Sequence, residues 1–296
     1  MKKSSWRNIG TEVNGNSVQE IILQAGLDYE VVKEPIYTGA GEMVPDAFVT
    51  RVKDEPVFFG TVGSRYEVIQ NAEAFSFIDN MVNNGLVFEK AGQTASGMVY
   101  IIASLEKINI FGDAMKPYII FQNSHDGSIP MKAALTTLRL VCENQFRVAF
   151  KDAANTVKIR HTFSANARMH EAEKVMQEAI LHNSKMSELA NEHNSIKLNA
   201  ITANKIAVEL FPYKENDSKT KVERAENARS EMLKILRYDD DLANHKNTGW
   251  GMLNAYSDYM THAKPNRATK NWEEARFMKL VNSDMNNAVE IIKSIA

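Results

Sequence analysis

Residues 87 to 105 of the chain, VFEKAGQTASGMVYIIASL, contain two strand-like runs around a short turn. Val87–Gln93 and Met98–Leu105 are rich in apolar and β-branched residues, which is typical of strands. Thr94–Gly97 between them consists of small residues and ends in glycine, as turns do. The stretch therefore predicts two successive strands of a sheet.

The neighbouring segments extend this pattern on both sides. Upstream, Asn71 is predicted to cap a helix over Ala72–Asn83, where apolar residues recur at helical spacing. Downstream, Tyr118–Asn123 and the centre of Met131–Cys142 are predicted strands, and Asn144–Ala153 is predicted to be helical. The order of elements is an α-β-β-β-α core, which predicts the α+β fold class.

The residues before this core contain further turn and cap signals. Ser17 is predicted to cap a helix over Val18–Ala25, because serine oxygens accept the free N–H groups of a first helical turn. Ala47–Val52 and Val57–Val62 are predicted to form a hairpin, and Tyr66–Ile69 to continue the sheet.

The two parts of the chain differ in glycine and proline content. Residues 1–160 hold 12 of the 14 glycines and five of the seven prolines. Since these residues mark turns and strand ends, we expect a domain with a mixed sheet over residues 1–163 and a mostly helical region over residues 164–296. The helices of that region are predicted at Ala167–Leu189, Ile196–Leu210, Thr220–Tyr238, Thr248–His262 and Trp272–Ile295.

Composition excludes several classes of protein. The chain has 296 residues, of which 44% are hydrophobic and 24% charged, so it is neither fibrous nor disordered as a whole. Its net charge is -2, so an attraction to nucleic acid must be local. A single cysteine excludes an intrachain disulfide and suits the cytoplasm. No apolar run is long enough to span a membrane, and no membrane partner is expected.

One segment stands out in charge. Residues 132–160 contain six basic residues against two acidic ones in a chain that is slightly acidic overall. Such a segment can follow a phosphate backbone, and the alternative is that its cations pair with acids elsewhere in the fold. The residues predicted to bind nucleic acid are Arg139, Arg147, Lys151, Lys158 and Arg160.

A second candidate site is the polar run Asn123–Ser128. Asn123, His125 and Asp126 form a possible ligand loop. The alternative is a turn in which Asp126 accepts backbone N–H groups and Gly127 supplies a positive φ. The metal-binding spacings that histidine and cysteine adopt in zinc sites are absent around this run, so we expect no metal and no cofactor.

Cys142 has two interpretations. It precedes a predicted helix, a position that lowers the pKa of a thiol, and could act as a nucleophile with His161. It also follows an apolar run, and free cysteines are among the most buried residues. We therefore predict a structural role for Cys142 and no catalytic residue, which makes the protein a non-enzyme.

Several short sequence motifs resemble those of an uncharacterised family of phage- and plasmid-borne proteins. They are Arg65–Asn71, Asn123–Ser128, Leu135–Asn144, Lys158–Thr162 and Gly249–Ala255, in the same order along the chain. The resemblance implies a mobile-element protein of a bacterial host cell, but no established reaction. The α-β-β-β-α order is also similar to the core of ring-forming single-strand annealing recombinases, which is an analogy of topology only.

These observations lead to two hypotheses about function. The first is a phage or plasmid nucleic-acid-binding protein that binds or anneals single-stranded DNA in recombination. The alternative is a non-enzymatic protein–protein effector with an anti-defence role, such as an inhibitor of a host defence complex. In either case, unpaired strand edges and methionine-rich helices predict a homo-oligomer.

Overall fold

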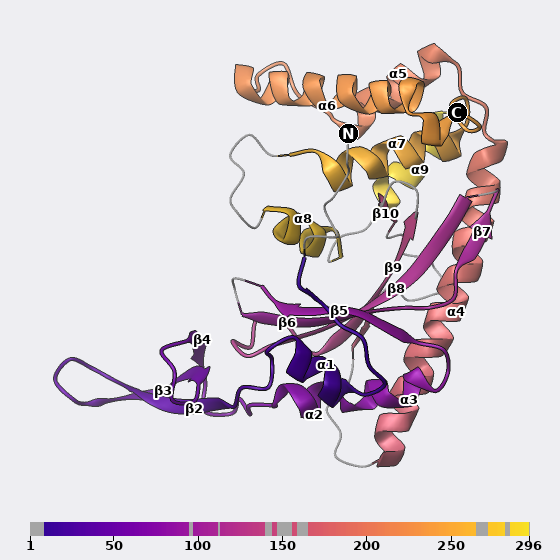
Figure 1. Cartoon of the computed structure of the whole chain (residues 1–296). Coiled ribbons are helices and arrows are strands. Elements are labelled where there is room, and N and C mark those ends of the chain that lie inside the picture. The colour runs from indigo at the N-terminus through magenta and orange to yellow at the C-terminus, as the bar shows by residue number, and fades with distance from the viewer. Residues whose placement is uncertain are drawn as a thin grey trace.

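The computed structural model describes residues 9–94, 97–111, 113–139, 144–146, 156–158, 165–264, 272–281 and 285–295. It has a large sheet at its centre, a small sheet at one side and a layer of helices at one end (Figure 1). A long helix runs beside the large sheet and reaches the helical layer (Figure 1). The α+β fold class is confirmed.

The large sheet has the strand order β1-β5-β6-β8-β9, with shorter strands at its margins. A mixed sheet is expected from the sequence. Each described pairing is antiparallel instead. The bounds are β1 Thr11–Glu12, β5 Val87–Gln93, β6 Met98–Ser104, β7 Ile108–Ile110, β8 Asp113–Ser124, β9 Lys132–Arg139, β10 Asn144–Phe146 and β11 Thr156–Lys158.

The centre of this sheet is buried on both faces. In β6, Val99 and Ile101 point into one core, whereas Tyr100 and Ile102 point into the other, and all four are fully buried. This explains why the sequence of β6 is continuously apolar rather than alternating.

Several helices cover the face of the sheet to which Val99 and Ile101 point, which we call the first face. They are α1 Val18–Gln24, α2 Asn71–Phe75, the 3-10 helix η1 Ser76–Ile78, α3 Asp79–Val82 and the first half of α4 Ala165–Ser195. The predicted cap Ser17 is confirmed, because its side chain accepts the N–H of Glu20.

The predicted cap at Asn71 is wrong. Gln70 occupies the N-cap position, and Asn71 is the first residue of α2. The Asn71 side chain is buried and bonds to distant groups instead, donating to the Leu27 carbonyl. The Asn71 side chain therefore makes a tertiary contact, whereas the local sequence pattern predicts that it caps the helix.

The small sheet consists of β2 Val31–Tyr37, β3 Met43–Val52 and β4 Phe58–Val62, and the predicted hairpin of β3 and β4 is confirmed. The predicted strand at Tyr66–Ile69 is wrong, because this segment has no strand pairing. Its carbonyl at Tyr66 accepts from the Lys33 ammonium, and the Tyr66 hydroxyl donates to the Ser124 carbonyl. These contacts hold the segment as a connection to α2.

The prediction of a helix over Asn144–Ala153 is wrong at its start. Asn144–Phe146 is strand β10, which pairs with Thr137–Arg139 at the edge of β9. Residues 147–153 lie outside the described residues. The helix that follows the sheet in the described chain is α4.

The second half of the chain is helical as predicted. Its remaining helices are α5 Ala200–Leu210, α6 Lys219–Tyr238, the 3-10 helix η2 Asp240–Leu242, α7 Gly249–His262, α8 Trp272–Val281 and α9 Asn286–Ile295. The single helix predicted over Trp272–Ile295 is two helices, α8 and α9. The described chain has no helix that is both long and apolar enough to cross a membrane.

Helix α4 belongs to two cores. Ala172, Val175 and Ala179 in its first half pack against the sheet, whereas Met186 and Leu189 pack in the helical core. Helix α8 contributes Phe277 and Met278 to the second face of the sheet. Side chains of α4 therefore connect one face of the sheet to the helical core, and side chains of α8 pack on the other face.

Candidate functional site

The basic residues predicted from the sequence lie along one margin of the large sheet. Strands β10 and β11 both pair with β9, at its two ends, and we call β9, β10 and β11 together the β9 edge. Arg139 pairs with Asn144 at one end, and Lys158 pairs with Lys132 at the other. The ends are seven residue steps apart along β9, so the β9 edge is about 24 Å long.

The structure describes two of the five predicted cations. The Arg139 backbone is in β9, and Lys158 is an exposed residue of β11. Arg147, Lys151 and Arg160 lie outside the described residues. In the sequence, Arg147 follows β10 directly and Arg160 comes two residues after β11.

The pairing register brings two lysines together. Lys132 and Lys158 are direct partners on neighbouring antiparallel strands. Directly opposed residues have Cβ atoms about 5 Å apart, and like charges at that separation are destabilising. No described carboxylate forms an ion pair with Lys158. The exposed ammonium of Lys158 is therefore the group at this position that an anion can reach.

The sequence alone does not reveal this lysine pair. Lys132 belongs to the basic segment but is not among the residues predicted to bind nucleic acid. Finding the pair requires the register of β9 and β11, and Thr156 comes 17 residues after Arg139 in the chain. No local signal in that interval specifies which residues become partners.

A buried tyrosine and helix α8 lie on the same face as the lysine pair. Tyr100, Gln122 and Lys132 are successive cross-strand neighbours in β6, β8 and β9. The Tyr100 hydroxyl donates to the Glu274 carboxylate of α8 over 2.6 Å. Burial, followed by the hydrogen bond to Glu274, raises the pKa of Tyr100 well above its usual range. Tyr100 is therefore a neutral donor that attaches α8 to the sheet.

Another polar cluster that the sequence does not reveal surrounds Glu89 of β5. Its carboxylate accepts hydrogen bonds from the Ser104 hydroxyl at 2.6 Å and the Tyr118 hydroxyl at 3.0 Å. Lys116 of β8 forms an ion pair with the same carboxylate. The cluster neutralises the charge of Lys116, which leaves the exposed Lys158 of the β9 edge as the stronger candidate for binding an anion.

The polar run Asn123–Ser128 comprises the end of β8 and the turn that follows it. The Asp126 carboxylate accepts the N–H of Ser128 at 2.9 Å, and Gly127 has a φ of 71°. The turn interpretation is therefore confirmed. Of the three residues predicted to contact a ligand, Asn123 and His125 are buried. Contact of this loop with a ligand stays a prediction.

The hydrogen bonds of His125 determine its tautomer. The amide nitrogen of Asn71 donates to the Leu27 carbonyl at 2.8 Å, so the amide oxygen of Asn71 faces His125. That oxygen is 2.9 Å from Nε2 of His125, which must therefore carry the proton. Nδ1 is buried and has no partner in the described part of the chain.

Aromatic rings complete the surroundings of His125. The Phe59 ring centroid is 5.1 Å from that of His125, and the Tyr29 centroid is 6.4 Å away. Burial lowers the pKa of His125 to about 4, so the imidazole is neutral at physiological pH. His125 thus joins the end of β8, the small sheet and α2.

No metal centre is evident in the described residues. No three of their His, Cys, Asp and Glu side chains are grouped closely enough to hold an ion. Cys142, Glu143 and His161 lie outside these residues, so the interpretations of Cys142 stay predictions.

Residues 58–282 match the model of a family described as a domain of unknown function, DUF932. The chain belongs to this family. The DUF932 match includes the His125 turn, the β9 edge and the helices up to α8. No curated protein and no solved structure matches the chain. The resemblance to an uncharacterised family is confirmed, whereas its association with phages and plasmids and the similarity to annealing recombinases stay predictions.

Proposed function

We propose that this DUF932 protein is a non-enzymatic, single-stranded nucleic-acid-binding protein of a phage or plasmid, and that the strand lies along the β9 edge. The observation that carries the proposal is the exposed Lys158 of β11, which forms no ion pair with a described residue. A phosphate can approach its ammonium from solvent, and neutralising that charge releases counterions from the nucleic acid.

The length of the β9 edge favours a nucleic-acid strand as the ligand over a single phosphate group. Among the described residues, Lys132 and Lys158 stand at one end of this margin and Arg139 at the other. A margin of about 24 Å accommodates several consecutive phosphates. Each phosphate that a lysine or arginine neutralises releases counterions, and this release supplies affinity without base specificity.

The experiment compares two charge reversals by fluorescence anisotropy with a labelled single-stranded DNA at low salt. Lys158→Glu should raise the dissociation constant at least tenfold. Lys219→Glu is the matched control, because Lys219 of α6 has a 91% exposed side chain and is not part of the β9 edge. Absence of binding by the unmodified protein, or equal effects of the two variants, would refute the proposal.

The second candidate function is a protein–protein effector that contacts a host complex. One observation favours it: the β2–β3 hairpin projects from the molecule (Figure 1). Near its tip, Tyr37 and Met43 are direct cross-strand partners and are both 58% exposed. Exposed apolar side chains at a projecting tip are typical of protein contacts.

The two candidates predict different complexes. A protein effector should form a stoichiometric complex with its partner that survives nuclease treatment and high salt. Tyr37→Ser with Met43→Ser should abolish that complex, whereas Lys158→Glu should not. A complex that nuclease removes would contradict the effector function.

A further inference from the structure

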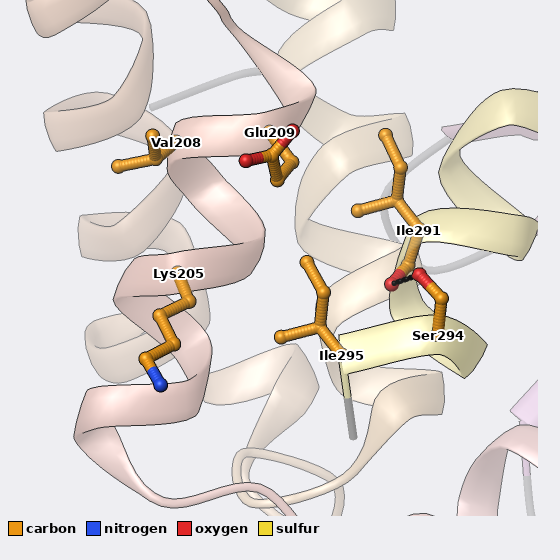
Figure 2. A pocket seen from close by; sticks show the side chains of 6 residues that line it. All are labelled: Lys205, Val208, Glu209, Ile291, Ser294 and Ile295. Atoms are coloured by element: carbon orange, nitrogen blue, oxygen red, sulfur yellow. Dashed lines mark hydrogen bonds between the residues drawn. The ribbon is translucent and has the colours of Figure 1, made fainter.

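Helices α5 and α9 form a shallow groove on the outside of the helical layer (Figure 2). Its volume is about 390 Å³, and apolar and charged residues both line it. The lining residues are Lys205, Val208, Glu209, Ile291, Ser294 and Ile295. None of them belongs to the β9 edge, so this surface is independent of the proposed nucleic-acid site.

The outer face of α5 carries two exposed apolar residues among its charged and polar ones. Ile201 is 70% exposed and Val208 is 44% exposed, and both lie on the helix face that also carries Lys205. The inner face is buried in the helical core through Ile206 and Leu210. Burying Ile201 and Val208 against a partner would remove this apolar surface from water.

The two charges of the groove do not neutralise each other. Lys205 and Glu209 are four residues apart on α5, yet their side chains extend in different directions (Figure 2). Neither forms an ion pair with a described residue. Lysine placed before glutamate at this spacing is the weaker order for an intrahelical pair, which agrees with the separation.

We infer that the groove is a dimer surface that binds a second copy of this chain. Two α5 helices can pack antiparallel through their outer faces, about a two-fold axis level with the midpoint between Lys205 and Glu209. This packing places Lys205 of each subunit beside Glu209 of the other. The same axis brings Val208 close to its own copy. Such a surface is self-complementary in both charge and apolar character, as an interface with two-fold symmetry requires.

The expected interface is small. Helix α5 has 11 residues and is about 16 Å long, which is short for a stable interface of about 800 Å² per subunit. The dimer should therefore be weak and concentration-dependent, with dissociation in the micromolar range.

The test is sedimentation equilibrium of the full chain over a wide concentration range, with two charge reversals. Lys205→Glu and Glu209→Lys each create a like-charge contact in a homodimer, so each should raise the dissociation constant at least tenfold. An equimolar mixture of the two variants restores both opposite-charge contacts, because one subunit carries two acids and the other two bases. The mixture should therefore dimerise again, as should the double variant.

Lys219→Glu is the control for an unspecific effect of charge, and circular dichroism checks that each variant is folded. A monomer at every concentration would overturn the inference. So would single variants that dimerise like the unmodified chain, or a mixture of the variants that stays monomeric.

Discussion

At the scale of single residues, buried polar side chains specify contacts between distant segments. Asn71 connects Leu27 to His125, and His125 connects the turn after β8 to the rings of the small sheet. These residue types are visible in the sequence, but the local pattern predicts a cap at Asn71 and a ligand loop at His125. Neither contact is local, so only the folded arrangement of the segments reveals it.

The low pKa of His125 predicts a pH-dependent stability. The unfolded chain binds a proton at His125 near pH 6.5, whereas burial lowers the folded pKa to about 4. The stabilisation that the neutral His125 side chain gives to the folded state is therefore complete above pH 6.5. As the pH falls toward 4, the free energy of unfolding decreases by up to about 3 kcal/mol.

Urea denaturation at a series of pH values measures this loss. His125→Gln keeps an N–H donor for Asn71 but cannot take up the proton, so its free energy of unfolding should fall less over the same interval. Equal losses for His125→Gln and the unmodified chain would show that His125 is not responsible.

Removing the Asn71 side chain should be more costly than removing an exposed asparagine. Asn71→Ala leaves the Leu27 carbonyl and the Nε2–H group of His125 without their partner, at an expected cost of about 2 to 3 kcal/mol. Asn84→Ala is the control, because Asn84 is exposed and donates only to the nearby Asn80 carbonyl. Similar melting temperatures for the two variants would contradict this account.

At the scale of elements, the sequence predicts well where the signal is local. The cap at Ser17, the hairpin of β3 and β4, and the helices of the second half all follow from neighbouring residues. The predictions fail where a distant partner decides the conformation. Asn144–Phe146 has a sequence compatible with a helix, but β9 offers it an unpaired edge. The lysine pair also depends on that edge, so the sequence could not predict it.

A close approach inside the helical region requires glycine at position 251. A Cβ atom there would lie 1.9 Å from the His245 carbonyl oxygen, which is a backbone atom and cannot rotate away. Gly251→Ala should therefore destabilise the protein by about 3 kcal/mol, measured by thermal denaturation. Gly39→Ala is the control, since a Cβ at Gly39 meets no atom within 4 Å. A melting temperature of Gly251→Ala that equals that of the control would contradict the close packing of the turn at His245 against α7.

At the scale of the whole molecule, α4 couples the sheet to the helices. One half of α4 packs in the core at the sheet and the other half packs in the helical core. Unfolding either the sheet or the helical layer therefore exposes apolar side chains of α4. We expect a single cooperative transition, in which circular dichroism and tryptophan fluorescence coincide in denaturant. Two separate transitions would instead indicate that residues 1–163 and 164–296 fold as independent domains.

The central claim is that the β9 edge binds a phosphate backbone, and the salt dependence of binding tests it most directly. The slope of log affinity against log salt for single-stranded DNA should be negative in the unmodified protein. Lys158→Gln removes one charge, so the account predicts a slope shallower by about 0.7, for the one phosphate that is no longer neutralised. An unchanged slope in Lys158→Gln, or no measurable binding by the unmodified protein at low salt, would contradict the account.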